Sequence, residues 1–131
     1  MHVLAPIDGS ECSFRALEFA IELAERFGGK LDVVHITDHE DEEVDQLLER
    51  ARAFCEERGR ETTPELSYSV GISRMRYANK IGKDILELVE DRDIDHVVMG
   101  HHGGNTVDRL VLGSATETVT RANTIGVSVI P

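Results

Sequence analysis

Short apolar runs alternate along the chain with longer segments in which apolar residues recur every three or four positions. The short runs predict buried strands over residues 3–7, 31–36, 66–70, 96–99 and 127–130. The longer segments predict helices with one buried face, the first following Ser10 as its N-cap and the others over residues 42–58, 83–92 and 114–122. Residues 71–82 lack clean periodicity and are predicted to form a long ordered loop. This alternation is typical of an α/β protein.

Strands that alternate with helices pair in parallel, through right-handed crossovers that place helices on both faces of the sheet. We therefore predict a doubly wound five-stranded parallel sheet in the order 3-2-1-4-5. In this order the winding direction reverses between the first and fourth strands, and ligands bind outside the carboxyl ends of the strands at that point. The loops expected to meet there span residues 6–10 and 100–105.

The predicted fourth strand leads into a glycine-rich loop and then into a helix. The loop holds Gly100, Gly103 and Gly104, and Gly113 and Ser114 lie at the start of the helix. Glycines let a ligand lie close to the backbone, and a helix start offers unpaired N–H groups and the positive end of its dipole. This order predicts a site for polyphosphate oxygens, with Mg²⁺ offsetting part of the ligand's charge. The alternative is simple loop closure, with Ser114 as an ordinary N-cap.

The first loop contributes one carboxylate, Asp8, to the same crevice. A carboxylate repels phosphate, but it can accept a hydrogen bond from a ribose hydroxyl or from an adenine amino group. The alternative is that Asp8 only forms an Asx-turn or assists the capping of the first helix.

Other chemistry-bearing residues point less directly to a function. His101 and His102 are adjacent and have no evident third metal ligand, so we expect them to flank the ligand. His35 is expected to be a packed or capping histidine. Cys12 is expected to be buried, with a reactive thiol at the helix start as the alternative. No set of nucleophile, base and orienting group can be assembled, so we predict no dedicated hydrolase.

Acidic residues outnumber basic residues by 25 to 14, which gives a formal net charge of −11. Such a chain is not expected to bind nucleic acid through a general electrostatic field, so an anionic ligand must be held by local geometry. Among the basic residues only Lys30, Lys80 and Lys83 are lysines. We hypothesise a halophilic source, in which salt screens the repulsion between carboxylates; an ordinary acidic cytosolic protein is the alternative.

A length of 131 residues predicts one domain. No apolar run approaches the ~20 residues of a membrane span, and the N-terminus has the pattern of a strand and not of a signal peptide. Cys12 and Cys55 lack metal-type spacing and fit reduced thiols. We therefore expect a cytoplasmic protein that does not act at a membrane.

Gly100, Gly103, Gly113 and Ser114 reproduce the spacing G-x2-G-x9-G-[S/T]. With this motif the chain resembles the universal stress protein family, and specifically its ATP-binding branch, over nearly its whole length. The resemblance implies a Rossmann-like α/β domain that binds ATP, often with Mg²⁺, in a regulatory role. It also implies a homodimer through the last strand, residues 127–130, an apolar edge that needs covering.

The resemblance also implies which positions contact the nucleotide. Pro6, Ile7 and Asp8 resemble the family's first-loop segment, whose aspartate contacts the nucleoside, and Ile36 lies at the strand end whose backbone reads adenine. The other positions implied to bind the cofactor are Met99, Gly100, His102, Gly103, Gly113, Ser114, Ala115 and Thr116.

Gly104 stands where the family often has a basic residue, so phosphate binding is expected to be weaker or to depend more on Mg²⁺ and on salt. The alternative function is a nucleotide-free dimeric stress adaptor, in which the glycines only close a turn. A phosphorylated receiver domain is not expected, because the third and fifth strands lead into Gly71 and Pro131 instead of an acceptor aspartate and a lysine.

Overall fold

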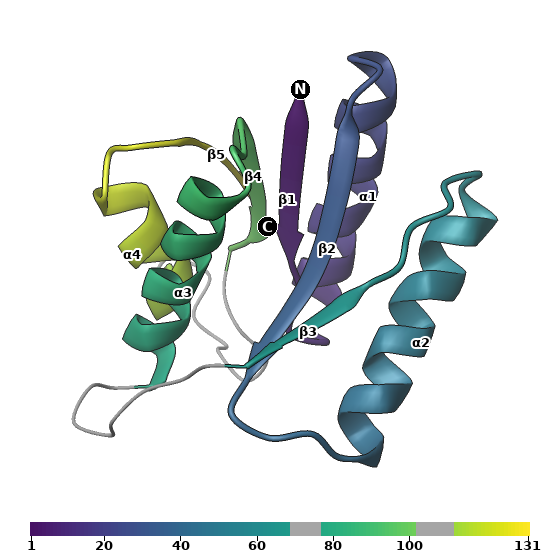
Figure 1. The fold of residues 1–131 in the computed structure, drawn as a ribbon, viewed down its shortest axis with the longest axis horizontal. Coiled ribbons are helices and arrows are strands. Elements are labelled where there is room, and N and C mark those ends of the chain that lie inside the picture. Colours follow the sequence, from purple (N-terminus) through teal and green to yellow (C-terminus); the bar gives the residue numbers. More distant parts are fainter. Residues whose placement is uncertain (69–76, 102–111) are drawn as a thin grey trace.

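The structure is a computed structural model that describes residues 1–68, 77–101 and 112–131. Strands and helices alternate through these ranges, as predicted. Their order is β1 (His2–Pro6), α1 (Glu11–Arg26), β2 (Lys30–Thr37), α2 (Glu42–Glu57), β3 (Glu65–Tyr68), α3 (Tyr77–Asp91), β4 (His96–Gly100), α4 (Ser114–Arg121) and β5 (Gly126–Ile130) (Figure 1).

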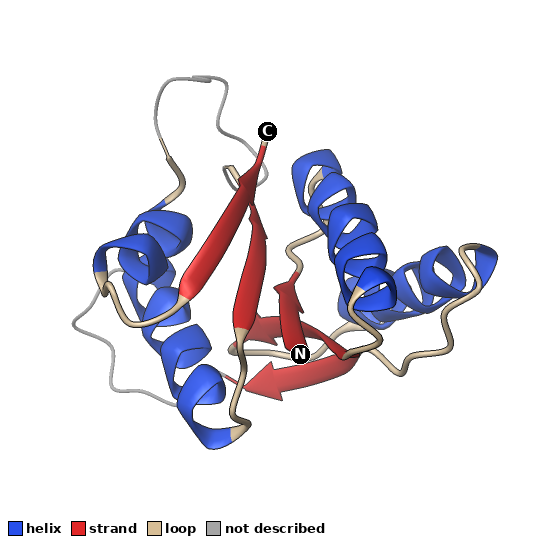
Figure 2. Cartoon of the chain, turned by 90° about the horizontal axis from the view of Figure 1, so that it is seen from above, coloured by secondary structure: helices blue, strands red, loops and turns tan. Residues whose placement is uncertain are grey.

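Within the described ranges, the strands form one parallel sheet in the order β3-β2-β1-β4-β5, which confirms the predicted order. The helices α1 and α2 cover one face of this sheet, and α3 and α4 cover the other (Figure 2). In the centre, Leu4 of β1 pairs with Asp32 of β2 on one side and with Val97 of β4 on the other. The winding direction therefore reverses between β1 and β4.

Successive residues of the central strands serve two separate hydrophobic cores. Val3 and Ala5 face α1 and α2, whereas Leu4 faces α3 and α4. In β4, Val98 belongs to the core under α1 and α2, and Val97 belongs to the core under α3 and α4. All five of these side chains are buried. The apolar runs in the sequence are continuous because a strand covered on both faces has no solvated side.

The ends of α1 and α2 follow from local chemistry. Ser10 caps α1, since its hydroxyl accepts a hydrogen bond from the backbone N–H three residues on, and Asp41 caps α2 in the same way. Each helix ends just before a glycine in the left-handed region, Gly28 (φ +60°) or Gly59 (φ +75°).

As far as the chain is described, no helix has the length and apolar character needed to cross a bilayer.

The prediction that residues 71–82 form a loop is wrong for residues 77–82, because α3 begins at Tyr77 and not near residue 83. Residues 71–76 lie outside the described residues. A glycine and several polar residues are weak helix formers by themselves, so helix formation here depends on tertiary packing. That packing is close: a Cβ on Gly82 would lie 2.6 Å from Cβ of Thr118 on α4.

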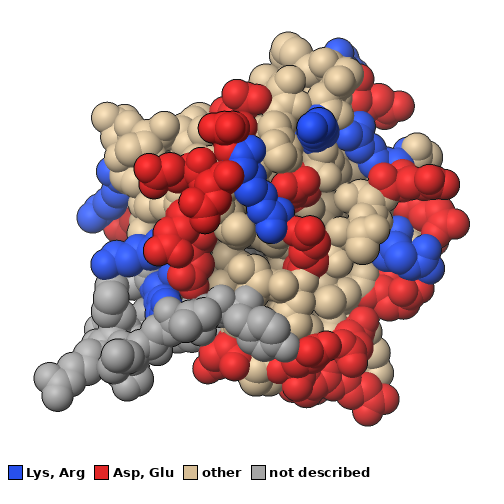
Figure 3. Space-filling view, viewed as in Figure 1, with Lys and Arg blue, Asp and Glu red and all other residues tan. Residues whose placement is uncertain are grey.

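Carboxylates are prominent on the face shown in Figure 3, over α3 and around the start of α2. The first turn of α2 carries Glu42, Glu43 and Asp45, where carboxylates interact favourably with the positive end of the helix dipole. Part of the excess of acidic residues therefore lies on this surface.

Candidate functional site

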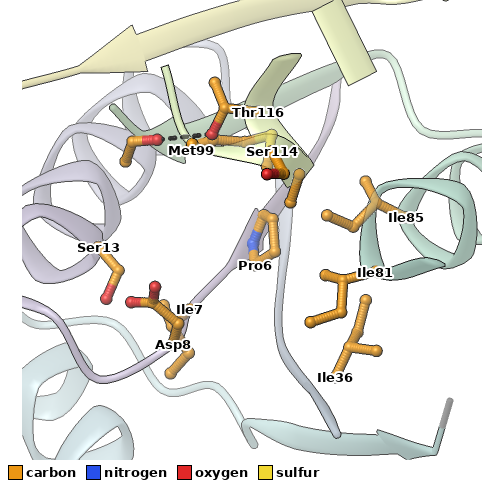
Figure 4. A pocket seen from close by; sticks show the side chains of 13 residues that line it. Pro6, Ile7, Asp8, Ser13, Ile36, Ile81, Ile85, Met99, Ser114 and Thr116 are labelled. Atoms are coloured by element: carbon orange, nitrogen blue, oxygen red, sulfur yellow. Dashed lines mark hydrogen bonds between the residues drawn. The ribbon is translucent and has the colours of Figure 1, made fainter. Parts of the chain in front are cut away.

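A cavity of about 220 Å³, here called the inner cavity, lies at the carboxyl ends of β1 and β4, where the winding direction reverses (Figure 4). All the residues predicted to bind the cofactor that the structure describes line it: Pro6, Ile7, Asp8, Ile36, Met99, Gly100, Gly113, Ser114, Ala115 and Thr116. His101, which was expected to flank the ligand, is described but is not among the lining residues. The remaining two predicted residues, His102 and Gly103, lie outside the described residues.

The floor of the inner cavity belongs to the ends of the central strands. Pro6 is the last residue of β1, where its missing N–H removes little from the sheet. The chain stays paired just beyond it, because the N–H of Ile7 donates to the carbonyl of Val34 (2.8 Å). Ile7 and Met99 are both buried, so the floor is apolar.

The start of α4 forms the polar end of the inner cavity. Gly113 is the N-cap, with extended backbone (φ −60°, ψ 150°) and no side-chain hydrogen bond to the first turn. The first N–H groups of a helix have no intrahelical acceptor, and they carry the positive end of the dipole. Ser114 is exposed and is the first helical residue, so the alternative in which Ser114 is the N-cap is wrong.

Two hydrogen bonds hold the start of α4 against the end of β4. The hydroxyl of Thr116 donates to the carbonyl of Gly100 (2.8 Å), and the N–H of Gly113 donates to the carbonyl of His101 (2.9 Å). The N–H of His101 in turn donates to the carbonyl of Ile130 (2.7 Å). The two ends of the glycine-rich connection and the end of β5 are therefore fixed relative to one another.

Gly100 lies close to the first turn of α1. A Cβ at this position would lie 2.8 Å from Sγ of Cys12 and 3.1 Å from the backbone N of Ser13. Cys12 is 1% exposed, and its Sγ accepts from the N–H of His101 (2.9 Å) and donates to the carbonyl of Ile130 (3.0 Å). The expected burial of Cys12 is confirmed, and its thiol links three elements.

Asp8 and Ser13 lie on one side of the inner cavity, opposite Ile36 and Ile81 (Figure 4). Oδ1 of Asp8 accepts hydrogen bonds from the backbone N–H (2.9 Å) and hydroxyl (2.5 Å) of Ser10, so the Asx-turn is present. The same side chain is exposed and lines the cavity, and Oδ2 accepts no hydrogen bond from the described residues. Asp8 can therefore shape the loop and still accept a hydrogen bond from a ligand.

His35 lies at the end of β2 and fixes the end of β1. Its Nδ1 donates to the carbonyl of Ile7 (2.7 Å), since a carbonyl can only accept. The expectation of a packed or capping histidine is confirmed.

A second, more open space of about 740 Å³, here called the outer hollow, lies between the end of β2 and α2. Asp38, Asp41 and Glu43 line it, together with His39 and Arg50. Nδ1 of His39 lies 2.8 Å from Oδ1 of Asp38, and Nε2 lies 3.2 Å from Oδ2 of Asp41. The hydrogen bond to Asp38 and the nearby carboxylates raise the pKa of His39 above its usual value.

The sequence model of the universal stress protein family matches residues 1–131. The chain belongs to the universal stress protein family. It is similar to universal stress protein A homolog 1 of Coxiella burnetii, with 30% identity over 134 residues that cover 96% of this chain and 92% of the relative.

Two solved structures illustrate the fold of this universal stress protein. One is that of the Archaeoglobus fulgidus universal stress protein in complex with dAMP, with a TM-score of 0.72, 22% identity, and coverage of 100% of this chain and 98% of that chain. The other is a universal stress protein in complex with cAMP, with a TM-score of 0.72, 21% identity, and coverage of 100% and 97%. They show that this universal stress protein has the same Rossmann-like α/β fold.

Three residues of the inner cavity were not predicted from the sequence: Ser13, Ile81 and Ile85. Ser13 follows from the capped first turn of α1, where its hydroxyl donates to the carbonyl of Ser10 (2.8 Å). Ile81 and Ile85 are four residues apart and share a helix face, a spacing that the loop prediction for residues 71–82 disregarded.

The inner cavity carries little positive charge of its own. Among the residues that the structure describes, neither lysine nor arginine lines it. An anion at the start of α4 would therefore depend on backbone N–H groups, the helix dipole and any cation that it brings with it.

Proposed function

We propose that this universal stress protein binds an adenine nucleotide, ATP with Mg²⁺, in the inner cavity and acts as a regulatory protein. The observation that carries the proposal is the polarity of the cavity. Hydrogen-bond donors gather at one end, at the start of α4, whereas the carboxylate of Asp8 and the side chain of Ile36 lie at the other. The phosphates belong at the donor end and the nucleoside at the acceptor end.

The relatives support the adenine part of this proposal. Universal stress proteins of the same fold have been solved in complex with dAMP and with cAMP, and both ligands contain an adenine base and a phosphate group. A site with one carboxylate acceptor and apolar walls suits the amino group and the faces of that base.

Mg²⁺ would reach the site on the phosphates. Within the described ranges, no group of three or more His, Cys, Asp or Glu side chains could hold a metal ion. The hydroxyl of Ser114, an exposed residue at the start of α4, could add to the ion's coordination, since Mg²⁺ prefers oxygen ligands and keeps several waters. The ion would offset the charge of the triphosphate near an acidic surface.

The proposal is tested with Ser114→Asp. At the first position of α4 an aspartate interacts favourably with the helix dipole, so the variant should fold with unchanged or slightly raised thermal stability. The same carboxylate would repel the phosphates, and we expect ATP affinity to fall roughly tenfold or more, equivalent to about 1.4 kcal/mol. Isothermal titration calorimetry of nucleotide-free protein with MgATP, at low and at high salt, measures the effect.

Thr124→Asp is the matched control, because it adds the same charge at an exposed position in the connection between α4 and β5. It should bind MgATP as the unmodified protein does. No binding of MgATP by nucleotide-free unmodified protein, or equal affinities of the Ser114→Asp and Thr124→Asp variants, would contradict the proposal. Mass spectrometry of small molecules extracted from fresh protein gives an independent result.

The proposed setting is the cytoplasm of a halophile. Two buried free cysteines, Cys12 and Cys55, suit a reducing compartment, and burial raises the pKa of the Cys55 thiol, which keeps it protonated. A net charge of −11 suits high salt, which screens repulsion between carboxylates. Thermal stability should then rise as the salt concentration is increased from low values to molar ones.

We also propose a homodimer through β5. In the described part of the chain β5 pairs only with β4, and Val127, Val129 and Ile130 remain partly exposed. An open apolar edge strand favours pairing with a second copy. Sedimentation velocity should show a dimer that Val129→Pro dissociates. If this dimer forms while MgATP binding is absent, the nucleotide-free adaptor is the better account.

A further inference from the structure

The inner cavity and the outer hollow share a border made of three side chains. Asp8, Ile36 and Ile81 line both spaces. Figure 4 shows Ile36 and Ile81 along one side of the inner cavity, opposite Asp8. Two branched apolar side chains and one carboxylate thus form a neck between a small apolar space and a larger polar one.

The position of Ile81 in this neck is fixed by its neighbour in the sequence. A Cβ on Gly82 would lie 2.6 Å from Cβ and 2.7 Å from Cγ2 of Thr118, and 3.2 Å from the carbonyl O of Ala115. The backbone of α3 therefore contacts the first turns of α4 directly. Ile81 and the proposed phosphate end of the site are held at a set separation.

The charge of the outer hollow determines which end of a nucleotide can face the neck. Asp38, Asp41 and Glu43 line the hollow, with Arg50 as its one arginine among the described residues. Phosphates would be repelled there, whereas the base edge, with its amino group near Asp8, can approach the neck. A group attached to that amino nitrogen would have to pass Ile36 and Ile81, on the side opposite Asp8, to reach the hollow.

We propose that Ile81 determines the specificity of the site by closing the neck to substituents on the amino group of the base. This inference rests on the proposed binding of an adenine nucleotide. The inner cavity has a volume of about 220 Å³, and Ile81 is one of the three side chains that line both it and the larger outer hollow. Ile81 restricts the site to an unsubstituted base, and a smaller residue there joins the two spaces.

The experiment compares ATP with N6-benzyl-ATP, both with Mg²⁺, by isothermal titration calorimetry. For the unmodified protein we expect a preference for ATP of roughly tenfold or more, because Ile81 blocks the space that the benzyl group would need. Ile81→Ala should lower that preference roughly tenfold, mainly through tighter binding of N6-benzyl-ATP. Ile81→Leu keeps the volume of the side chain and should retain the preference.

Leu86→Ala is the matched control, since Leu86 is on the same helix and packs on the same core but lines neither space. It should weaken stability without altering the ratio of the two affinities. If unmodified protein binds ATP but Ile81→Ala leaves the ratio unchanged, or if unmodified protein binds both nucleotides equally, the role of Ile81 is wrong and the proposed function stands. If unmodified protein binds neither nucleotide, the proposed function itself fails.

Discussion

Replacing Gly82 with alanine sets two opposing effects against each other. Alanine is favoured over glycine inside a helix by about 1 kcal/mol. However, the added Cβ would lie 2.6 Å from Cβ of Thr118, and that atom is attached directly to the backbone of α4 and cannot rotate away. Relief requires α3 and α4 to separate, so the cost should lie in the upper part of the roughly 1–3 kcal/mol typical of overpacking. We expect a net destabilisation of about 1–2 kcal/mol.

This loss of unfolding free energy should lower the melting temperature. The entropy of unfolding of a 131-residue chain is about 0.28 kcal/mol/K, so the expected shift is about 4–7 °C. Circular dichroism during heating and urea titration would measure it. Binding of MgATP should weaken as well, because Ile81 and Ile85 would move with α3.

The control is a pair of variants at Glu87, an exposed position on α3. Comparison of Glu87→Gly with Glu87→Ala gives the intrinsic difference between glycine and alanine in this helix, and alanine should be the more stable by about 1 kcal/mol. If Gly82→Ala is as stable as the unmodified protein or more stable, then α3 and α4 do not pack as closely as the structure shows.

Three further results are expected. Burial acts to raise the pKa of Asp32, but the contacts of its Oδ2 with Nε2 of His2 (3.0 Å) and with Nη1 of Arg92 (3.0 Å) outweigh burial and lower the pKa. The resulting stability is present above about pH 4 and is lost as the pH falls through the folded-state pKa, so Asp32→Asn should flatten the fall of the urea midpoint at acid pH. Burial lowers the pKa of His96 below 6.5, so protonation of His96 favours the unfolded chain. The free energy of unfolding should therefore rise with pH in the range just below 6.5. In a plot of urea midpoint against pH, His96→Asn should remove this rise. Gly100→Ala would place a Cβ 2.8 Å from a buried sulfur and should lower the melting temperature and weaken MgATP binding in calorimetry; unchanged values would contradict the close approach of α1 and β4.

Local patterns anticipated most of the candidate site because that site is built at the ends of strands. Asp8, Gly100 and Ser114 each follow or precede a clear apolar run or helix start, and parallel pairing brings such ends to one edge of the sheet. The cavity formed by Pro6–Asp8 and the start of α4 is therefore a consequence of strand order.

The wall contributed by α3 could not be anticipated in this way. Ile81 and Gly82 stand in a stretch without a clean helical period, and Gly82 packs closely against Thr118, a residue far away in the sequence. Local propensity is weak there, and a helix start that tertiary packing stabilises leaves little local trace in the sequence. A local pattern also could not show that Asp8 both forms its own turn and lines the cavity, so these two roles were predicted as alternatives.

The sequence by itself determined the alternation of strands and helices, the parallel sheet and the crevice where its winding reverses, because periodicity and the handedness of crossovers leave few other arrangements. Only the tertiary structure decided how closely α3 approaches α4, that Cys12 joins α1 to β5 and to His101 just after β4, and that Ile36 and Ile81 line two spaces. These features depend on distances between side chains that are remote in sequence, and such distances are set by packing and not by any local pattern.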